Sequence, residues 1–175
     1  LSAASVMATV RTVSNQPGGG VQFNNIQAAV DASANGDTVY VHGSANIYAS
    51  FNLVDKKLTI IGPGWSPDKN LPLQANISGC FFANTAAPGS PAGTELQGLV
   101  FSANVDLVSA GLGGNQGYSG LRLIRCQFNQ QVGFSFGISD LLVEGCMFLT
   151  TINFTTGGSN SVSNTIFQNN LFLFL

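Results

Sequence analysis

Charge is scarce in this sequence. Only 8% of its 175 residues are Asp, Glu, Lys or Arg, against about 25% in an ordinary soluble domain. One His and one Trp are present, and no apolar run is long enough to span a membrane. The net charge is -2, without a basic patch or an acidic tail. We therefore expect no nucleic-acid partner, no transmembrane segment and few catalytic side chains.

Apolar and uncharged polar residues supply the rest of the chain. Hydrophobic residues make up 45% of it, including 13 Phe. With so little charge, Asn, Gln, Ser, Thr and Gly must form the surface that faces water. Such a surface is typical of extracellular β architectures, so we expect a secreted or cell-surface protein.

Both ends of the sequence carry apolar segments. Residues 1–8 are small and apolar, and Val6–Ala8 fits the cleavage pattern of a signal peptide, so residues 1–8 are predicted to be a signal-peptide remnant. A short apolar first strand is the alternative. Leu171–Leu175 is an apolar strand without a turn or a charge after it. Residues 9–175 are therefore interpreted as the N-terminal portion of one domain, truncated at its C-terminus.

One helix and two strands are predicted near the start. The pair Asn24–Asn25 is a good N-cap before the apolar face that begins at Ile26, and Gly36 sits where a C′ glycine belongs. Alternating strands follow at residues 37–41 and 58–61.

A short motif then repeats along the chain. The pattern apolar-x-x-small-x-Phe begins at residues 77, 96, 123, 143 and 167, a spacing of 19 to 27 residues. A period in this range indicates a solenoid, in which each coil is stabilised by its neighbours. Each motif would supply two short strands and a bend. Its last position would build an interior aromatic ladder from Phe82, Phe101, Phe128, Phe148 and Phe172.

The three cysteines share one place in this motif. Cys80, Cys126 and Cys146 are expected to stack inward with Leu99 and Asn170, whose amide would hydrogen-bond along the coil axis. Buried free thiols are the first interpretation. A Cys126–Cys146 disulfide is the alternative in a secreted chain, although stacking in parallel strands suits its geometry poorly.

Four segments resemble a known superfamily: residues 26–31, 36–41, 47–48 and 58–62. They are similar to the opening of pectate-lyase-like right-handed β-helix proteins. The low-charge, Asn-rich composition is similar to that of secreted proteins of Bacteroidota. The resemblance implies an all-β, single-stranded right-handed parallel β-helix whose open N-terminal end is capped by an α-helix. It implies no single activity, because the superfamily contains lyases, hydrolases, esterases, tailspikes and adhesins.

Acidic residues are scattered, and no adjacent pair occurs. The best catalytic candidates are Arg122, Arg125, Asp140 and Glu144, with Arg125 and Glu144 predicted to be diagonal neighbours on consecutive coils. A lyase site would contain such an arginine beside carboxylates. The alternative is a surface ion pair worth less than about 1 kcal/mol. No metal or other cofactor is expected, except Ca²⁺ if the chain is a lyase.

Exposed aromatic rings are candidates for sugar binding, because a flat ring suits the apolar face of a sugar. Trp65 and Tyr118 are the main candidates, together with Tyr40 and Tyr48. His42 lacks carboxylate neighbours in the sequence and is interpreted as a surface residue.

Three classes of function follow. The first is a structural or adhesive β-helix module, with polysaccharide as a possible partner and no catalytic site in this segment. The second is the N-terminal part of a polysaccharide lyase or glycoside hydrolase with its catalytic coils further along. The third is a tail fibre, which would form an obligate trimer, whereas a monomer is the expected state.

Overall fold

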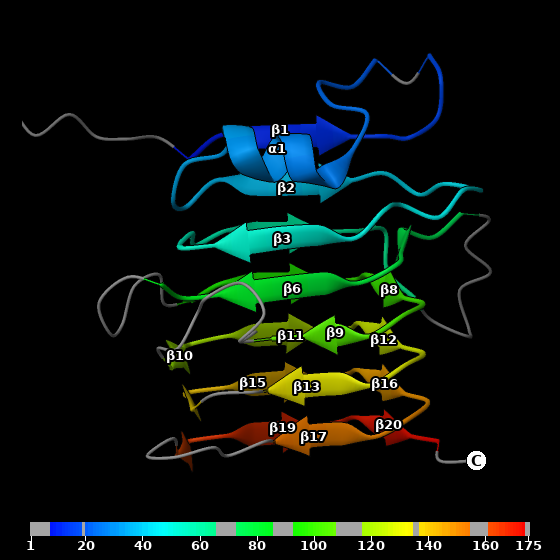
Figure 1. Ribbon diagram of the computed structural model, residues 1–175. Coiled ribbons are helices and arrows are strands. Elements are labelled where there is room, and N and C mark those ends of the chain that lie inside the picture. The colour runs from blue at the N-terminus through cyan, green and yellow to red at the C-terminus, as the bar shows by residue number, and fades with distance from the viewer. Residues whose placement is uncertain are drawn as a thin grey trace, which may run out of the picture.

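The chain winds into a parallel β-solenoid of about five turns, with one short helix (Figure 1). The computed structural model describes residues 8–18, 20–65, 73–85, 93–107, 117–134, 137–154 and 161–173. All pairs of named strands are parallel. The predicted all-β class is confirmed. Residues 1–7 lie outside the described part of the chain, so the signal-peptide remnant at residues 1–8 stays a prediction.

Four sheets run along the solenoid axis, and each coil adds one strand to most of them. The long sheet contains β1 (Val10–Val13), β2 (Thr38–Val41), β4 (Thr59–Ile61), β7 (Glu95–Gln97), β11 (Arg122–Ile124), β15 (Leu142–Glu144) and β19 (Ile166–Gln168). The side sheet contains β5 (Asn76–Ile77), β8 (Val100–Phe101), β12 (Gln127–Phe128), β16 (Met147–Phe148) and β20 (Leu171–Phe172).

The other two sheets complete the coils. The front sheet faces the viewer in Figure 1 and contains β3 (Phe51–Val54), β6 (Cys80–Ala83), β9 (Val105–Asp106), β13 (Val132–Phe134) and β17 (Ile152–Phe154). The small sheet contains β10 (Tyr118–Ser119), β14 (Ile138–Ser139) and β18 (Val162–Ser163).

A column of phenylalanine rings fills the interior beside the side sheet. Phe101, Phe128, Phe148 and Phe172 stack with centroids 5.3, 5.0 and 5.2 Å apart. This part of the predicted ladder is confirmed. Phe82 does not belong to it: Ile77 pairs with Phe101, and Phe82 lies in the front sheet. The motif at residues 77–82 spans the next corner of the coil, so it matches the repeat only in composition.

The same shift of register removes Cys80 from the cysteine stack. Cys126 and Cys146 lie between the long and side sheets, whereas Cys80 belongs to β6. All three are buried free thiols, and burial raises the pKa of the Cys80 and Cys126 thiols. Asn170 accepts a hydrogen bond from the Cys146 amide at 2.8 Å and donates one to the Val143 carbonyl at 2.9 Å, as expected for a polar group in the stack.

Helix α1 (Ile26–Ala32) lies against the first strands, and its apolar face is buried as predicted. The Asn25 side chain caps it by accepting a hydrogen bond from the Ala28 amide at 2.8 Å. The predicted C-terminal end is wrong. The helix is capped by Ser33 in an extended conformation, and Gly36, with φ of 91°, belongs to the following turn.

Candidate functional site

The four predicted catalytic residues do not converge. Arg122 forms an ion pair with Glu95, 3.0 Å from Nε to Oε2, on the outer face of the long sheet. Asp140 precedes β15, whereas Glu144 ends it. The Asp140 carboxylate accepts hydrogen bonds from Asn164 and Ser119, and these bonds lower its pKa.

Arg125 and Glu144 are neighbours on consecutive coils, as predicted. Ile124 pairs with Glu144, and the Arg125 amide donates a hydrogen bond to the Glu144 carbonyl at 2.8 Å. The contact is made by the backbone, and the structure describes no ion pair between the two side chains. Arg125 has φ of 50°, and its side chain passes over Gly145. These contacts hold a corner of the coil in place.

Tyr118 is buried rather than exposed. Only 3% of its surface is accessible, and its ring lies 6.1 Å from that of Phe82 between centroids. Its hydroxyl and that of Thr94 are 2.8 Å apart, and desolvation raises the Tyr118 pKa to about 12. Tyr118 therefore packs the core and offers no face to a ligand.

The other predicted aromatic residues are dispersed. Tyr48 is buried. Tyr40 is 37% exposed on the long sheet and contacts His42 edge-to-face, with centroids 5.2 Å apart. Trp65 is half-buried, and its buried indole N–H has no hydrogen-bond partner among the described residues.

A groove that the sequence did not reveal runs along the corner between the side and front sheets. We refer to it as the corner groove. Its volume is about 480 Å³. It is lined by uncharged residues from the turns that precede β3, β6, β9 and β13, together with one aromatic ring: Ser50, Ser78, Phe81, Ser102, Ala103, Asn104 and Gln130.

Phe81 points outward because its strand neighbours Cys80 and Phe82 point inward. It is half-buried. Asn52 and Asp106 are its partners on the adjacent strands, so the ring stands between an amide and a carboxylate. In the repeat motif apolar-x-x-small-x-Phe, Phe81 falls at a position where any residue is allowed. Strict alternation along Cys80–Phe82 is the signal that could have revealed it.

Beside the groove, Gly79 allows the backbones of two consecutive coils to approach closely. A Cβ atom at this position would lie 2.4 Å from the Asn104 carbonyl oxygen, which is far too close for any side chain. The turn that contains Asn104 is held by hydrogen bonds from the Ser102 amide to the Ile77 carbonyl, 2.9 Å, and from the Ala103 amide to the Ser78 carbonyl, 2.7 Å. The groove is therefore shaped by fixed backbone.

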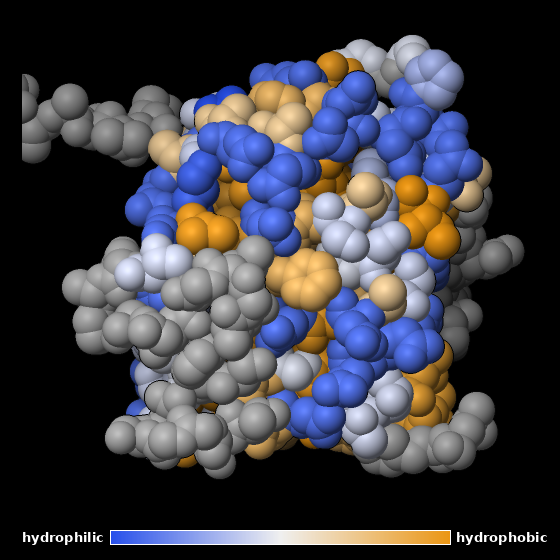
Figure 2. Space-filling view, in the orientation of Figure 1, coloured by the Kyte–Doolittle hydropathy of each residue, from blue (hydrophilic) through white to orange (hydrophobic). Residues whose placement is uncertain are grey.

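Polar residues dominate the face around the front sheet. Figure 2, in the orientation of Figure 1, shows hydrophilic residues with isolated apolar ones between them. No group of three His, Cys, Asp or Glu that could hold a metal ion occurs in the described part of the chain. The helix described there, α1, has seven residues, too few to cross a bilayer.

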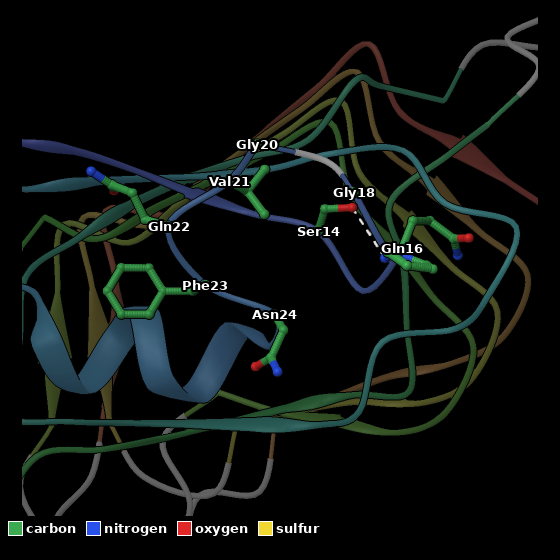
Figure 3. Close-up of a pocket in the computed structure, with 9 residues that line it drawn as sticks. Ser14, Gln16, Gly18, Gly20, Val21, Gln22, Phe23 and Asn24 are labelled. Carbon is green, nitrogen blue, oxygen red and sulfur yellow. Dashed lines mark hydrogen bonds between the residues drawn. The ribbon is translucent and has the colours of Figure 1, made fainter.

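A second hollow, of about 600 Å³, lies between β1 and α1 (Figure 3). Its wall includes Ser14 and Gln16, where the Gln16 amide donates a hydrogen bond to the Ser14 hydroxyl at 3.2 Å. Phe23 extends along α1, away from these two residues, and packs against the core. The ring that lines this hollow therefore belongs to the edge of the core, whereas Phe81 in the corner groove does not pack against the core cluster.

Comparison with protein-family models, with curated proteins and with solved structures finds no match for this chain.

Proposed function

We propose that the chain is a secreted or cell-surface β-helix module, structural or adhesive, that binds polysaccharide through the corner groove. The observation that carries the proposal is the outward ring of Phe81 among serine hydroxyls and amide side chains. An aromatic face beside groups that donate and accept hydrogen bonds is complementary to a sugar, which has both an apolar face and hydroxyls. Secretion is supported by the apolar residues 1–8 and by the low charge of the chain.

The chemistry of the groove suits sugars. The apolar face of a pyranose stacks on an aromatic ring, and its hydroxyls both donate and accept hydrogen bonds. Ser78 offers a hydroxyl and Gln130 an amide, so each can serve as donor or acceptor. The Ser102 hydroxyl donates to the Ile77 carbonyl at 3.3 Å and can still accept a hydrogen bond from a ligand. Because stacked coils hold these groups in place, little order has to be gained on binding.

Affinity electrophoresis in gels that contain cellulose derivatives, xylan, mannan or pectin tests this proposal. We expect at least one of the polysaccharides to retard the protein, and Phe81→Ala to weaken that binding about fivefold, because a stacked ring contributes about 1 kcal/mol. Tyr40→Ala, which removes an exposed ring from the long sheet, is the matched control and should bind normally.

Several results would overturn the proposal. If the Phe81→Ala variant binds as tightly as the parent, and circular dichroism shows both to be folded, the corner groove is not the binding site. Unsaturated sugar products from pectin with Ca²⁺, abolished by Arg125→Ala, would establish the lyase alternative instead. A trimer in size-exclusion chromatography with light scattering would favour the tail-fibre class.

A further inference from the structure

We infer that the ligand of the corner groove is a linear, uncharged glycan that lies parallel to the solenoid axis across four coils. The inference rests on the proposed function and specifies the substrate class and orientation at the same site. Two independent features support it: where the charges lie, and which coils supply the lining residues.

The described cations all lie away from the groove. Arg11 pairs with Asp37 at 3.5 Å, and Arg122 pairs with Glu95 on the long sheet. Lys56 donates hydrogen bonds to helix carbonyls at 2.8 and 2.9 Å. The two that remain are Lys57, which lies close to Gly93, and Arg125, at the corner between the long and side sheets.

The charge next to the groove is negative. Asp106 follows Phe81 in the outward column of the front sheet, and the lining residues are all uncharged. A uronate or a sulfated sugar would lose water at its anionic group without gaining any of the cations in the described part of the chain, and it would be repelled by the carboxylate. The groove therefore favours a glycan without charge.

The lining residues come from the same corner of four successive coils. They are not all in register, because the strand pairing places Ser50 level with Gly79 and Gln130 level with Ala103. Ser50 precedes β3, Ser78 precedes β6, Ser102 precedes β9 and Gln130 precedes β13. Strands rise about 4.8 Å from one coil to the next, so the line from the first to the last spans about 14 Å. A ligand that places one sugar unit over each of these coils would occupy the groove with about four units.

Isothermal titration calorimetry with oligosaccharides of two to six units tests this inference. The probes are cello-, xylo- and manno-oligosaccharides, with oligogalacturonates as the acidic series. For the uncharged series that binds, we expect affinity to rise up to about four units and then to level off. We expect oligogalacturonates of equal length to bind at least tenfold more weakly.

Variants at one end of the groove sharpen the test. Gln130→Ala should weaken the four-unit ligand severalfold and leave the two-unit ligand, held at Phe81, unchanged. Gln97→Ala on the outer face of the long sheet is the control and should alter neither. A purely structural effect of Gln130→Ala would weaken every length equally, which would contradict the axial orientation.

The failures of the two proposals are distinguishable. Polysaccharide binding that depends on Phe81, but has no dependence on length or prefers the acidic series, refutes this inference and leaves the proposed function intact. Absence of any binding that depends on Phe81 refutes both.

Discussion

The first and last coils of the described solenoid differ in how well other parts of the chain cover them. At the N-terminal end, the Gln27 side chain accepts a hydrogen bond from the Asn52 amide at 2.7 Å and donates one to its carbonyl at 3.2 Å. The segment at Phe23 pairs with β1 in the same way, with two backbone bonds of 3.0 Å. A helix side chain and a loop thus satisfy the edges that a further coil would otherwise satisfy.

The last described coil keeps its apolar side chains accessible. Phe172 is 41% exposed, whereas Phe128 in the same column is fully buried. Ile166 and Leu171 are 55% and 45% exposed. The comparison teaches that a column residue is fully buried only when a coil lies on each side of it.

The largest loss of stability is expected when a phenylalanine is removed from the middle of the aromatic column rather than from its end. Phe128→Ala should lower the free energy of unfolding by about 3–5 kcal/mol, because it empties a site between two stacked rings. Phe172→Ala should cost less than about 2 kcal/mol, since that ring already meets solvent. Urea unfolding followed by circular dichroism measures both. Equal losses would contradict the dependence on neighbouring coils.

The next effect concerns a buried carboxylate at the N-terminal end. Hydrogen bonds from the Thr9 and Ala34 amides, and the Arg11 guanidinium, lower the Asp37 pKa. Because the pKa of Asp37 is lower in the folded protein than in the unfolded chain, its charge stabilises the fold at pH values above the unfolded-state pKa of about 3.9. This contribution is lost as the pH falls through the folded-state pKa.

Asp37→Asn should therefore cost about 2 kcal/mol at pH 7. The difference from the parent should shrink as the pH is lowered below about 4. Urea midpoints of both proteins between pH 7 and pH 2.5 give the comparison, in which the titration of all other groups cancels. If the difference in urea midpoint between the two proteins does not change with pH, the charge of Asp37 does not contribute to the stability difference.

Removing the edge cover should have a smaller effect on stability and a distinct effect on association. Gln27→Ala deletes both hydrogen bonds to Asn52, which should cost about 1 kcal/mol and leave the β3 edge open to pairing. Thermal unfolding measures the first effect, and light scattering over concentration the second. Gln97→Ala, away from any edge, is the control and should match the parent in both.

The smallest effect is expected for the ion pair on the long sheet. Arg122 is half-exposed, so its pair with Glu95 should contribute less than about 1 kcal/mol, and less still in high salt. A double-mutant cycle with Arg122→Ala and Glu95→Gln isolates the coupling energy. A coupling above about 2 kcal/mol would show that this face is far less hydrated than its exposure indicates.

Much of the coil geometry could be predicted from local patterns. Leu123 and Val143 face inward, Cys126 and Cys146 stack, and Asn170 bonds along the axis, because alternation and a regular period determine these directions. The patterns failed at Ile77–Phe82. That segment has the composition of the motif but turns at a different corner, and composition alone does not set the register.

The candidate site was less predictable than the fold. Tyr118 was expected at the surface because tyrosine suits sugar binding, yet its hydroxyl finds Thr94 inside the coil. Phe81 was overlooked because its neighbours in the groove come from other coils. Neither assignment follows from local sequence, since each depends on the segment that lies one coil away.

The sequence by itself determined the solenoid class, the inward columns and the capped helix, because strand alternation, repeat spacing and capping are properties of short segments. Only the tertiary structure decided which corner each motif occupies, and which polar turns line up with Phe81. Those features depend on the register between coils, which is set by packing across segments about twenty residues or more apart.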